Sequence, residues 1–320
     1  MQLTRKAFIE ITEFLDSILQ YTDNTWKQQL RWKFKNGRRG QGTSNKRSKK
    51  RHIDGIIEED EYRKLIADLK REWSQKKKHH SKVKDIMSAT FANRQTWIVS
   101  GEPAVLEVLD TFPCLERANY LELELKLLLG KEESSDFMVE WPLWRDKVLL
   151  YVDAEKTTMK RLNKIATQYK SEKERLKQFD DTLEDLQDFF ALQYFQSILS
   201  YRAEKQIIYS FSDDVNVDDV IRDIAISQPC LVRFLSDVGC PKYHIVIEGQ
   251  MLHKVTSTRK ALLNLIAAYY VFNISYPPLQ SATLIFIQHY IMNITFEKKL
   301  PSSVAALGSN LIRIDLQDMD

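Results

Sequence analysis

Four residues in the C-terminal third have the types and spacing of metal ligands. Cys240 and His244 are separated by three residues, with Cys230 and His253 nearby. A structural zinc site needs four convergent nitrogen or sulfur ligands, which usually come in close pairs. The three cysteines include no Cys-x-x-Cys pair, and Cys230 and Cys240 flank a predicted strand, where a free cysteine packs as a small hydrophobic residue. We therefore expect no metal and no cofactor.

Two carboxylate pairs, Asp213-Asp214 and Asp218-Asp219, precede a helix expected at residues 220–226. Such acids could hold Mg²⁺ for phosphoryl-transfer or nuclease chemistry. Acids before a helix more often act as N-caps and as favourable first-turn charges, and we expect that role here. A nuclease-like centre would require Asp213, Asp237 and Glu248 to converge from separate elements.

Other catalytic patterns are absent from the sequence. His79 and His80 lie in a basic cluster with Lys76, Lys77 and Lys78, which Lys82 and Lys84 extend. No Gly-x-Ser-x-Gly nucleophile elbow occurs, and the nine glycines are too scattered for a phosphate-binding loop. We predict no catalytic residues, and an enzyme is the less favoured class of function.

Positive charge is concentrated near the N-terminus. Residues 25–53 hold eleven Lys or Arg residues and no acid: Lys27, Arg31, Lys33, Lys35, Arg38, Arg39, Lys46, Arg47, Lys49, Lys50 and Arg51. The whole chain is only +3, and residues 1–100 carry 23 basic against 12 acidic residues, whereas the remainder carries 24 against 32. Such a local excess attracts polyanions, because each neutralised phosphate releases counterions.

These basic residues, called here the basic arm, divide into two parts. Up to residue 36 the cations alternate with Trp26, Trp32 and Phe34 on an expected helix, a pattern suited to nucleic acid. Residues 46–51, KRSKKR, also fit a nuclear-import signal. The alternative is a solubilising linker beside a helix whose aromatic residues face the core.

The elements expected to position these residues are mostly helices. Apolar residues recur at helical spacing in residues 5–35, 56–97, 156–177 and 183–201, and the last two segments are expected to pair as a hairpin. Residues 120–129 alternate like a strand, but their Leu, Glu and Lys content and the following Gly130 favour a helix.

The C-terminal third changes character. Residues 230–235, 243–248 and 251–255 indicate two or three antiparallel strands, followed by apolar helices at 257–272 and 280–293. The predicted fold is mostly α with a small α+β C-terminal domain whose strands are covered by helices. The expected divisions are a basic helical region at 1–36, a flexible linker at 37–55, a helical middle region at 56–206, the α+β domain at 207–300 and a tail at 301–320.

Location is inferred from what the sequence lacks. The sparse cysteines indicate a reducing compartment. The N-terminal residues mix charges into their apolar positions, unlike a signal peptide, and the apolar windows are too short and too polar to span a bilayer. We expect an intracellular protein without membrane contact, in the nucleus if residues 46–51 act as an import signal and otherwise in the cytoplasm.

Three blocks of sequence resemble the region after the SAM domain in sterile alpha motif domain-containing protein 3 and its fish and invertebrate relatives. They are the Trp26 to Arg39 segment, the MSATFANR of residues 87–94 with the VLEVLDTFPCL of 105–115, and the segments 243–249, 261–276 and 283–288. The resemblance implies a fold and no specific activity. No SAM domain precedes residue 1, so the chain is expected to be either a fragment or a relative without that domain.

These observations favour a non-enzymatic binding or adaptor protein that contacts nucleic acid through the basic arm without sequence readout. The first alternative is a protein-interaction scaffold whose arm is only a linker or an import signal. The second is a degenerate enzyme derived from a mobile element. Protein partners are compatible with all three, and the sequence does not indicate an oligomeric state.

Overall fold

The computed structural model describes residues 55–130, 133–155, 160–176, 183–200, 207–224, 228–235, 241–252, 254–295 and 299–315. The helices before the sheet are α3 (Glu59–Ser74), α4 (His80–Ala89), α5 (Phe91–Gly101), α6 (Val105–Thr111), the 3₁₀-helix η1 (Pro113–Glu116), α7 (Ala118–Leu129), α8 (Glu133–Glu155), α9 (Lys160–Leu176) and α10 (Leu183–Leu199). The remaining elements are β1 (Ile208–Ser212), α11 (Val217–Ile224), β2 (Cys230–Leu235), β3 (Lys242–Ile247), β4 (Gln250–Met251), α12 (Thr258–Val271), α13 (Ser281–Phe286), the π-helical turn η3 (Ile287–Ile291) and α14 (Ser302–Ile312).

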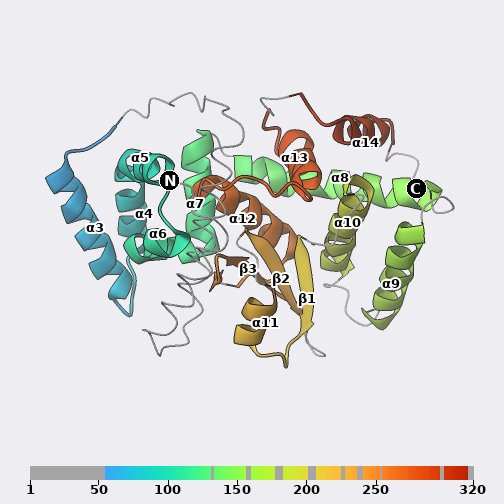
Figure 1. Cartoon of the computed structure of the whole chain (residues 1–320), viewed down its shortest axis with the longest axis horizontal. Helices are drawn as coiled ribbons and strands as arrows, with labels where there is room; N and C mark the ends of the chain where they lie inside the picture. Colours follow the sequence, from blue (N-terminus) through green and yellow to red (C-terminus); the bar gives the residue numbers. More distant parts are fainter. Residues whose placement is uncertain are drawn as a thin grey trace, which may run out of the picture.

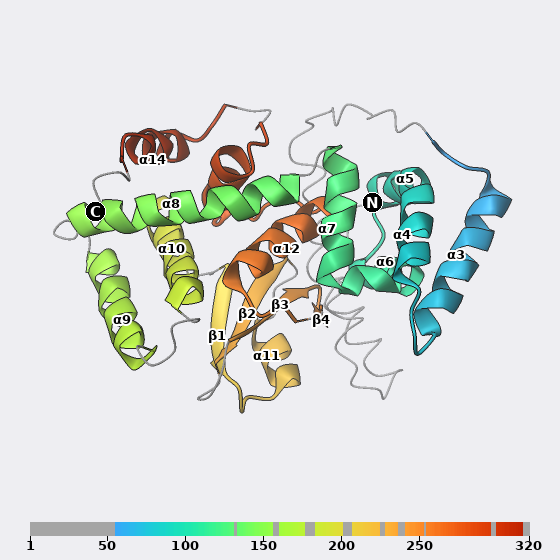
Figure 2. The same ribbon diagram turned by 180° about the vertical axis from the view of Figure 1, so that it is seen from behind.

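The fold is mostly helical with one small sheet, as predicted. The sheet lies between α11 on one face and α12 on the other (Figure 1). Helices α3 to α7 form one end of the molecule, and α9 and α10 form the other (Figure 1). Helix α8 runs along one side and contacts α7, α10, α12 and α14, so it ties the two ends together (Figure 2).

The sheet has the order β1-β2-β3-β4 and is mixed. Strand β1 pairs with β2 in parallel, with Ile208 opposite Leu231, while β2 and β3 are antiparallel. Helix α11 forms the crossover that a parallel pair requires. The turn from β3 to β4 contains Glu248 and Gly249, both with positive φ, as two-residue hairpins require.

Alternate residues of β2 enter two different hydrophobic clusters. Cys230, Val232 and Phe234 pack toward Val220 of α11, whereas Leu231 joins the main core with the residues of α12. Successive side chains of a strand point to opposite faces, so a strand covered on both sides carries apolar residues on both faces, and in β2 only the buried Arg233 departs from this. This dual coverage explains why CLVRFL contains no simple alternation of polar and apolar residues.

One hydrophobic core joins the helical part to the sheet. It extends from Leu69 in α3 to Leu311 in α14, and α12, which is buried on nearly every side, packs against both α7 and β3. A helix that is apolar all round belongs inside a core. The main core therefore contains residues from both sides of residue 207.

Several predicted elements are present where the sequence placed them. Residues 120–129 form most of α7, which ends at Gly130 in the left-handed conformation with φ 66°. Helices α9 and α10 pack against each other as a hairpin. The strands predicted at 230–235 and 243–248 are β2 and β3, and residue 255 makes only an isolated bridge with Tyr243.

Two features differ from the prediction. Strand β1 was not predicted, because its five residues become a strand through pairing with β2 across the α11 crossover. The predicted tail instead contains α14, which buries Val304, Leu307 and Leu311. These residues recur at the i, i+3, i+7 spacing of an amphipathic helix. The sequence prediction of a tail from residue 301 is therefore wrong for residues 302–312.

Helix α14 approaches η3 closely at Gly308. A Cβ atom added to Gly308 would lie 2.1 Å from Cζ of Tyr290, whose ring packs against Trp144 and Phe286. We expect Gly308→Ala to lower the free energy of unfolding by about 1–3 kcal/mol, as overpacking does. Urea unfolding followed by circular dichroism measures this change. The exposed Ser309→Ala is the matched control, and equal stability of the two variants would contradict the prediction.

A buried polar network joins α8, α10 and α12. Asp188 of α10 accepts a hydrogen bond of 2.8 Å from Nε1 of Trp141, and its carboxylate also contacts Arg145 and Arg259. Asp185, one turn earlier, accepts a hydrogen bond from the backbone N–H of Thr258. The second contact caps the start of α12, since the first N–H groups of a helix lack partners within it.

Candidate nucleic-acid interface

The eleven residues of the predicted basic arm all lie outside the described residues. The structure therefore leaves Lys27, Arg31, Lys33, Lys35, Arg38, Arg39, Lys46, Arg47, Lys49, Lys50 and Arg51 as predictions. The cluster that follows the arm in the sequence is described, and it lies where α3 meets α4.

Residues 70–84 carry seven Lys or Arg residues and one acid, Glu72. The exposed or half-buried lysines of residues 76–84, together with Arg117 just before α7, are called the α3–α4 basic surface. Its members are Lys76, Lys77, Lys78, Lys82, Lys84 and Arg117. Three elements thus contribute to it: the loop after α3, the first turns of α4 and the residue before α7.

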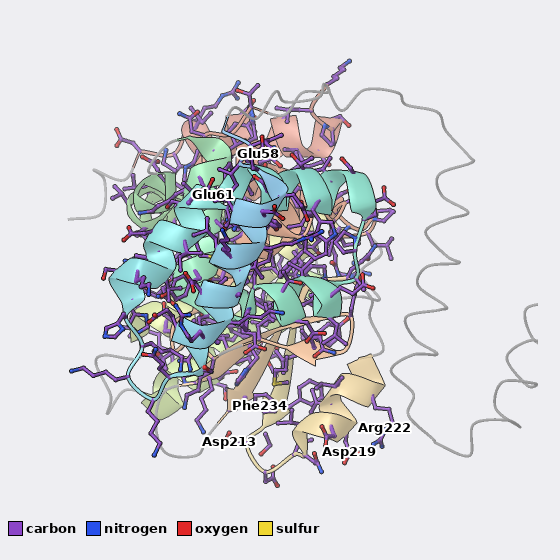
Figure 3. All side chains as sticks on the ribbon, turned by 90° about the vertical axis from the view of Figure 1, so that its left-hand side faces the viewer. Glu58, Glu61, Asp213, Asp219, Arg222 and Phe234 are labelled. Atoms are coloured by element: carbon purple, nitrogen blue, oxygen red, sulfur yellow. The ribbon has the colours of Figure 1, made fainter. Side chains whose placement is uncertain are left out.

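The local sequence places this charge at one end of α3. The helix begins with Glu59, Asp60 and Glu61 and ends with Arg71 in its last turn. This order complements the helix dipole, because acids are favoured at the N-terminus and cations at the C-terminus. Figure 3 shows Glu58 and Glu61 together at the start of α3. Sixteen residues of helix separate the acidic and basic ends by about 24 Å.

Glu72 anchors the loop and α4 to α3. Its side chain is only 5% exposed, and it accepts hydrogen bonds of 2.6 Å from Nζ of Lys82 and 3.1 Å from Nδ1 of His79. The hydrogen bonds from Lys82 and His79 lower the pKa of Glu72. The single acid of the segment is therefore engaged by two of its neighbours, Lys82 and His79. Arg71 pairs with Asp68, which lies just before the segment, at 2.6 Å.

Trp73 brings cations from two elements together. Nζ of Lys78 lies 5.0 Å from the centre of its ring, and the Arg117 guanidinium lies 5.9 Å from it. Both distances are within the range of cation–π attraction. Tyr120 meets Trp73 in a T-shaped contact at 5.5 Å, and Trp73 also packs against the main core. The ring thus holds a loop lysine beside the start of α7.

His80 contacts Tyr120 through a hydrogen bond and through ring stacking. Its Nδ1 is 2.9 Å from the Tyr120 hydroxyl, and the two rings are stacked at 6.2 Å. Tyr120 is fully buried, and burial raises the pKa of its hydroxyl to about 12. The phenol therefore stays protonated and neutral, so it adds no negative charge beneath the basic surface.

Three lysines of the surface are exposed and form no ion pair with any residue that the structure describes: Lys76, Lys77 and Lys84. Lys84 lies one turn after His80 on the same side of α4. Unpaired, exposed ammonium groups remain available to an external anion. Several such cations on one surface suit a polyanion, because each phosphate that they neutralise releases counterions.

The predicted metal-ligand set is only partly described. Cys240 and His253 lie outside the described residues. Cys230 is a buried free thiol whose pKa burial raises to about 12, and it packs with Val232 and Phe234 as the sequence predicted. Nδ1 of His244 donates a hydrogen bond to the Leu252 carbonyl at 3.0 Å. Within the described ranges no three His, Cys, Asp or Glu residues are placed to hold a metal ion.

Two of the three carboxylates considered for a nuclease-like centre are engaged in separate contacts. Asp213 pairs with Lys242 at 2.9 Å, at the first residue of β3, whereas Glu248 follows the last residue of that strand. The two acids therefore lie about 20 Å apart along the strand. Glu248 accepts a hydrogen bond of 2.9 Å from the backbone N–H of Val105 and so caps α6. Asp237 lies outside the described residues.

Helix α11 uses the second carboxylate pair as predicted. Asp218 and Asp219 occupy its first turn, and Asn216 accepts a hydrogen bond of 2.9 Å from the Asp218 N–H. Asp219 also pairs with Arg222 at 2.8 Å. Figure 3 shows Asp213, Asp219 and Arg222 near α11, apart from the acidic start of α3. Their role is to stabilise the helix N-terminus.

A buried arginine explains one of the sequence blocks that resemble a known family. Arg94, fully buried, pairs with the equally buried Glu124 of α7 through Nε at 2.9 Å. It also donates to Oγ1 of Thr90 and to the carbonyl of Met87, and its guanidinium lies 4.8 Å from the Phe112 ring. The residues of MSATFANR and the following Phe112 therefore converge on one structural ion pair.

The protein is thus a mostly helical one with a basic surface at its N-terminal described end. Residues 59–116 match the family model of the helical domain of sterile alpha motif domain-containing protein 3. The match shows that the chain contains a region related to that protein outside the SAM domain. No curated protein and no solved structure matches the chain.

The matched residues include the blocks at 87–94 and 105–115 on which that resemblance was predicted, and they contain most of the α3–α4 basic surface. The block at 26–39 and the blocks from 243 onward lie outside the match. The family description names a domain and no activity, so the function has to be argued from the surface.

Two residues of the site, Trp73 and Arg117, carry no signal of their role in the sequence. The cluster from Lys76 to Lys84 is visible in the sequence, whereas neither Trp73, within the expected helical segment 56–97, nor Arg117 is marked by its sequence neighbours. Arg117 lies 44 residues after Trp73, and nothing in its neighbourhood indicates that the two meet. In addition, no helix in the described parts of the chain is both long enough and apolar enough to cross a bilayer.

Proposed function

We propose that this chain is a non-enzymatic binding protein that contacts nucleic acid through phosphates, without reading its sequence. Two basic segments support the proposal, the basic arm of residues 25–53 and the α3–α4 basic surface. Lysine and arginine contacts to phosphate position a protein on nucleic acid but carry no sequence information. The basic arm would supply a loose electrostatic tether, and the folded surface would supply a defined contact.

The observation that carries the proposal is the charge balance of the α3–α4 basic surface. Residues 76–84 contain five lysines and no acid, and the nearby Glu72 is taken up by Lys82 and His79, while Arg71 pairs with Asp68. A merely solvated helix face more often mixes both signs, as α9 does with Lys164, Glu172 and Glu174. The concentration of one sign on a folded surface favours an anionic partner.

The decisive measurement is fluorescence anisotropy of the full chain with a labelled mixed-sequence duplex DNA over a salt series. We expect binding whose logarithm falls linearly with the logarithm of salt concentration. The variant Lys76→Gln/Lys77→Gln/Lys84→Gln should reduce the magnitude of the slope by about 1 for each lysine, so by about 3 in total. Neutralising Arg38, Arg39 and residues 46–51 should reduce it further.

A matched control changes the same number of charges elsewhere. Lys164→Gln/Lys170→Gln/Lys299→Gln removes three exposed lysines, two of them on α9 at the far end of the molecule from α3 (Figure 1). This variant should keep the wild-type slope. Absence of binding at low salt would contradict the proposed function, and equal losses in both triple variants would contradict the assignment to this surface.

The adaptor and import roles are part of the same proposal. If residues 46–51 act as an import signal, a fluorescent fusion of the chain will enrich in the nucleus, and neutralising those residues will abolish the enrichment. A protein-interaction scaffold remains the alternative function. A stable protein partner that co-purifies after nuclease treatment, together with no nucleic-acid binding, would favour the scaffold.

A further inference from the structure

The aromatic ring in the α3–α4 basic surface already has partners. Cations lie over Trp73 at 5.0 Å and 5.9 Å, Tyr120 meets it in a T-shaped contact, and it packs against the core. Tyr120 itself is fully buried. An unpaired base could therefore stack on Trp73 only by displacing Lys78 or Arg117.

This arrangement differs from a single-strand binding surface. Proteins that bind single strands combine a basic groove with aromatic rings on which successive bases stack, each contributing about 1–3 kcal/mol. In the α3–α4 basic surface the Trp73 ring instead makes cation–π contacts with Lys78 and Arg117. Duplex DNA presents about one charge per 1.7 Å of its axis, twice the density of one strand, so fixed cations gain more from a duplex.

Trp73 also fixes the relative position of cations from distant parts of the chain. Lys78 belongs to the loop after α3, and Arg117 precedes α7. Lys78 additionally donates to the Gln75 carbonyl at 3.4 Å. Cations that are held before binding lose less side-chain freedom when a phosphate arrives, which is the advantage of preorganisation.

Resting on the function proposed above, we propose that the α3–α4 basic surface binds the phosphate backbone of double-stranded nucleic acid, and that Trp73 is a positioning residue that holds Lys78 and Arg117 for this contact. The ring contacts no base. Specificity for the duplex then comes from charge density and from the fixed spacing of the cations.

The test compares a mixed-sequence duplex DNA with its single strand, matched in total phosphate, by anisotropy with the full chain. We expect the duplex to bind about tenfold more tightly, with a steeper salt dependence. Trp73→Phe keeps a ring face and should bind within about twofold of wild type. Trp73→Leu should weaken duplex binding several-fold and reduce the salt slope by about 1–2, through the loss of two positioned cations.

A second variant controls for the case in which Trp73→Leu loses binding only because it misfolds. Lys78→Gln/Arg117→Gln leaves the Trp73 ring in place and should reproduce the Trp73→Leu loss, while circular dichroism and the melting temperature stay at wild-type values. Retention of duplex binding by this variant would overturn the proposal.

The proposal is also overturned if the single strand binds as tightly as the duplex and quenches a tryptophan signal that Trp73→Phe removes. That result would show base stacking and would leave the proposed function intact. Failure of the wild type to bind either probe contradicts the proposed function as well. The two failures are therefore distinguishable.

Discussion

Replacing Arg94 by methionine should destabilise the protein by about 3–5 kcal/mol, because breaking a buried ion pair leaves its partner charged and unpaired. Arg94 and Glu124 are both fully buried, and Gln95 also donates to the Glu124 carboxylate at 2.7 Å. Without the guanidinium, Glu124 keeps one side-chain donor in a core that excludes water. Urea unfolding of the full chain, followed by circular dichroism, measures the loss.

A second substitution separates the cost of an unpaired charge from the cost of lost packing. Arg94→Met combined with Glu124→Leu should recover most of the stability, because apolar residues of similar volume often replace a buried pair at little cost. The exposed pair Arg63–Glu59 gives the control, and Arg63→Met should change stability by no more than about 0.5 kcal/mol. A loss below about 1 kcal/mol for Arg94→Met would contradict the buried-pair interpretation.

The stability of the protein should carry a pH dependence that comes from Asp188. Burial raises the pKa of Asp188 to about 6, although Arg259, Trp141 and Arg145 act in the opposite direction. An unfolded aspartate has a pKa of about 3.9. Between about pH 4 and pH 6 the folded state therefore binds the proton more strongly than the unfolded state, and the Asp188 contribution to stability falls as pH rises through this window.

Between about pH 4 and pH 6 the Asp188 contribution to the free energy of unfolding changes by about 3 kcal/mol, at about 1.4 kcal/mol for each unit of pKa difference. Asp188→Asn mimics the protonated carboxyl and cannot ionise, so it should remove this dependence. The measurement is the difference in unfolding free energy between wild type and variant at several pH values from about 4 to 7. A difference that stays constant with pH would show that Asp188 ionises normally.

Glu184 supplies a control of the opposite sign. A hydrogen bond from Arg259 is the main cause that lowers the pKa of Glu184 in the folded protein. The Glu184 carboxylate therefore stabilises the fold above its unfolded pKa, and this stabilisation is lost as pH falls through the folded pKa. Glu184→Gln should therefore reduce stability at neutral pH and have little effect in acid. Its side chain is mostly exposed, and solvent screening makes the effect smaller than that of Asp188.

The elements that the sequence predicted well are those decided by neighbouring residues. Helix α7 illustrates this, because the helix propensities of its Leu, Glu and Lys residues and the stop at Gly130 outweighed its strand-like alternation. Helix α14 was not predicted, although Val304, Leu307 and Leu311 have helical spacing, and residues 301–320 were expected to be a tail. Its glycine is required by contact with Tyr290, which no local pattern reveals.

The candidate site shows the same division. The excess of lysine in residues 76–84 is visible in the sequence, because charge is a property of composition. Whether Asp213 and Glu248 share a site depends on the distance between them. The ion pair of Asp213 with Lys242 places it beside the first residue of β3, whereas Glu248 follows the last residue of that strand. The basic arm lies outside the described residues, so its role stays a prediction.

By itself, the sequence determined the mostly helical class, the position of the basic segments and the resemblance that the family match at residues 59–116 confirms. Each of these depends on composition or on residues a few positions apart. The tertiary structure decided which charges remain available. It buried Arg94 against Glu124, engaged Glu72 with Lys82, and brought Arg117 to Trp73. Those contacts join residues that lie 10 to 44 positions apart in the sequence. They form because tertiary packing brings the residues together, and no local sequence pattern encodes that packing.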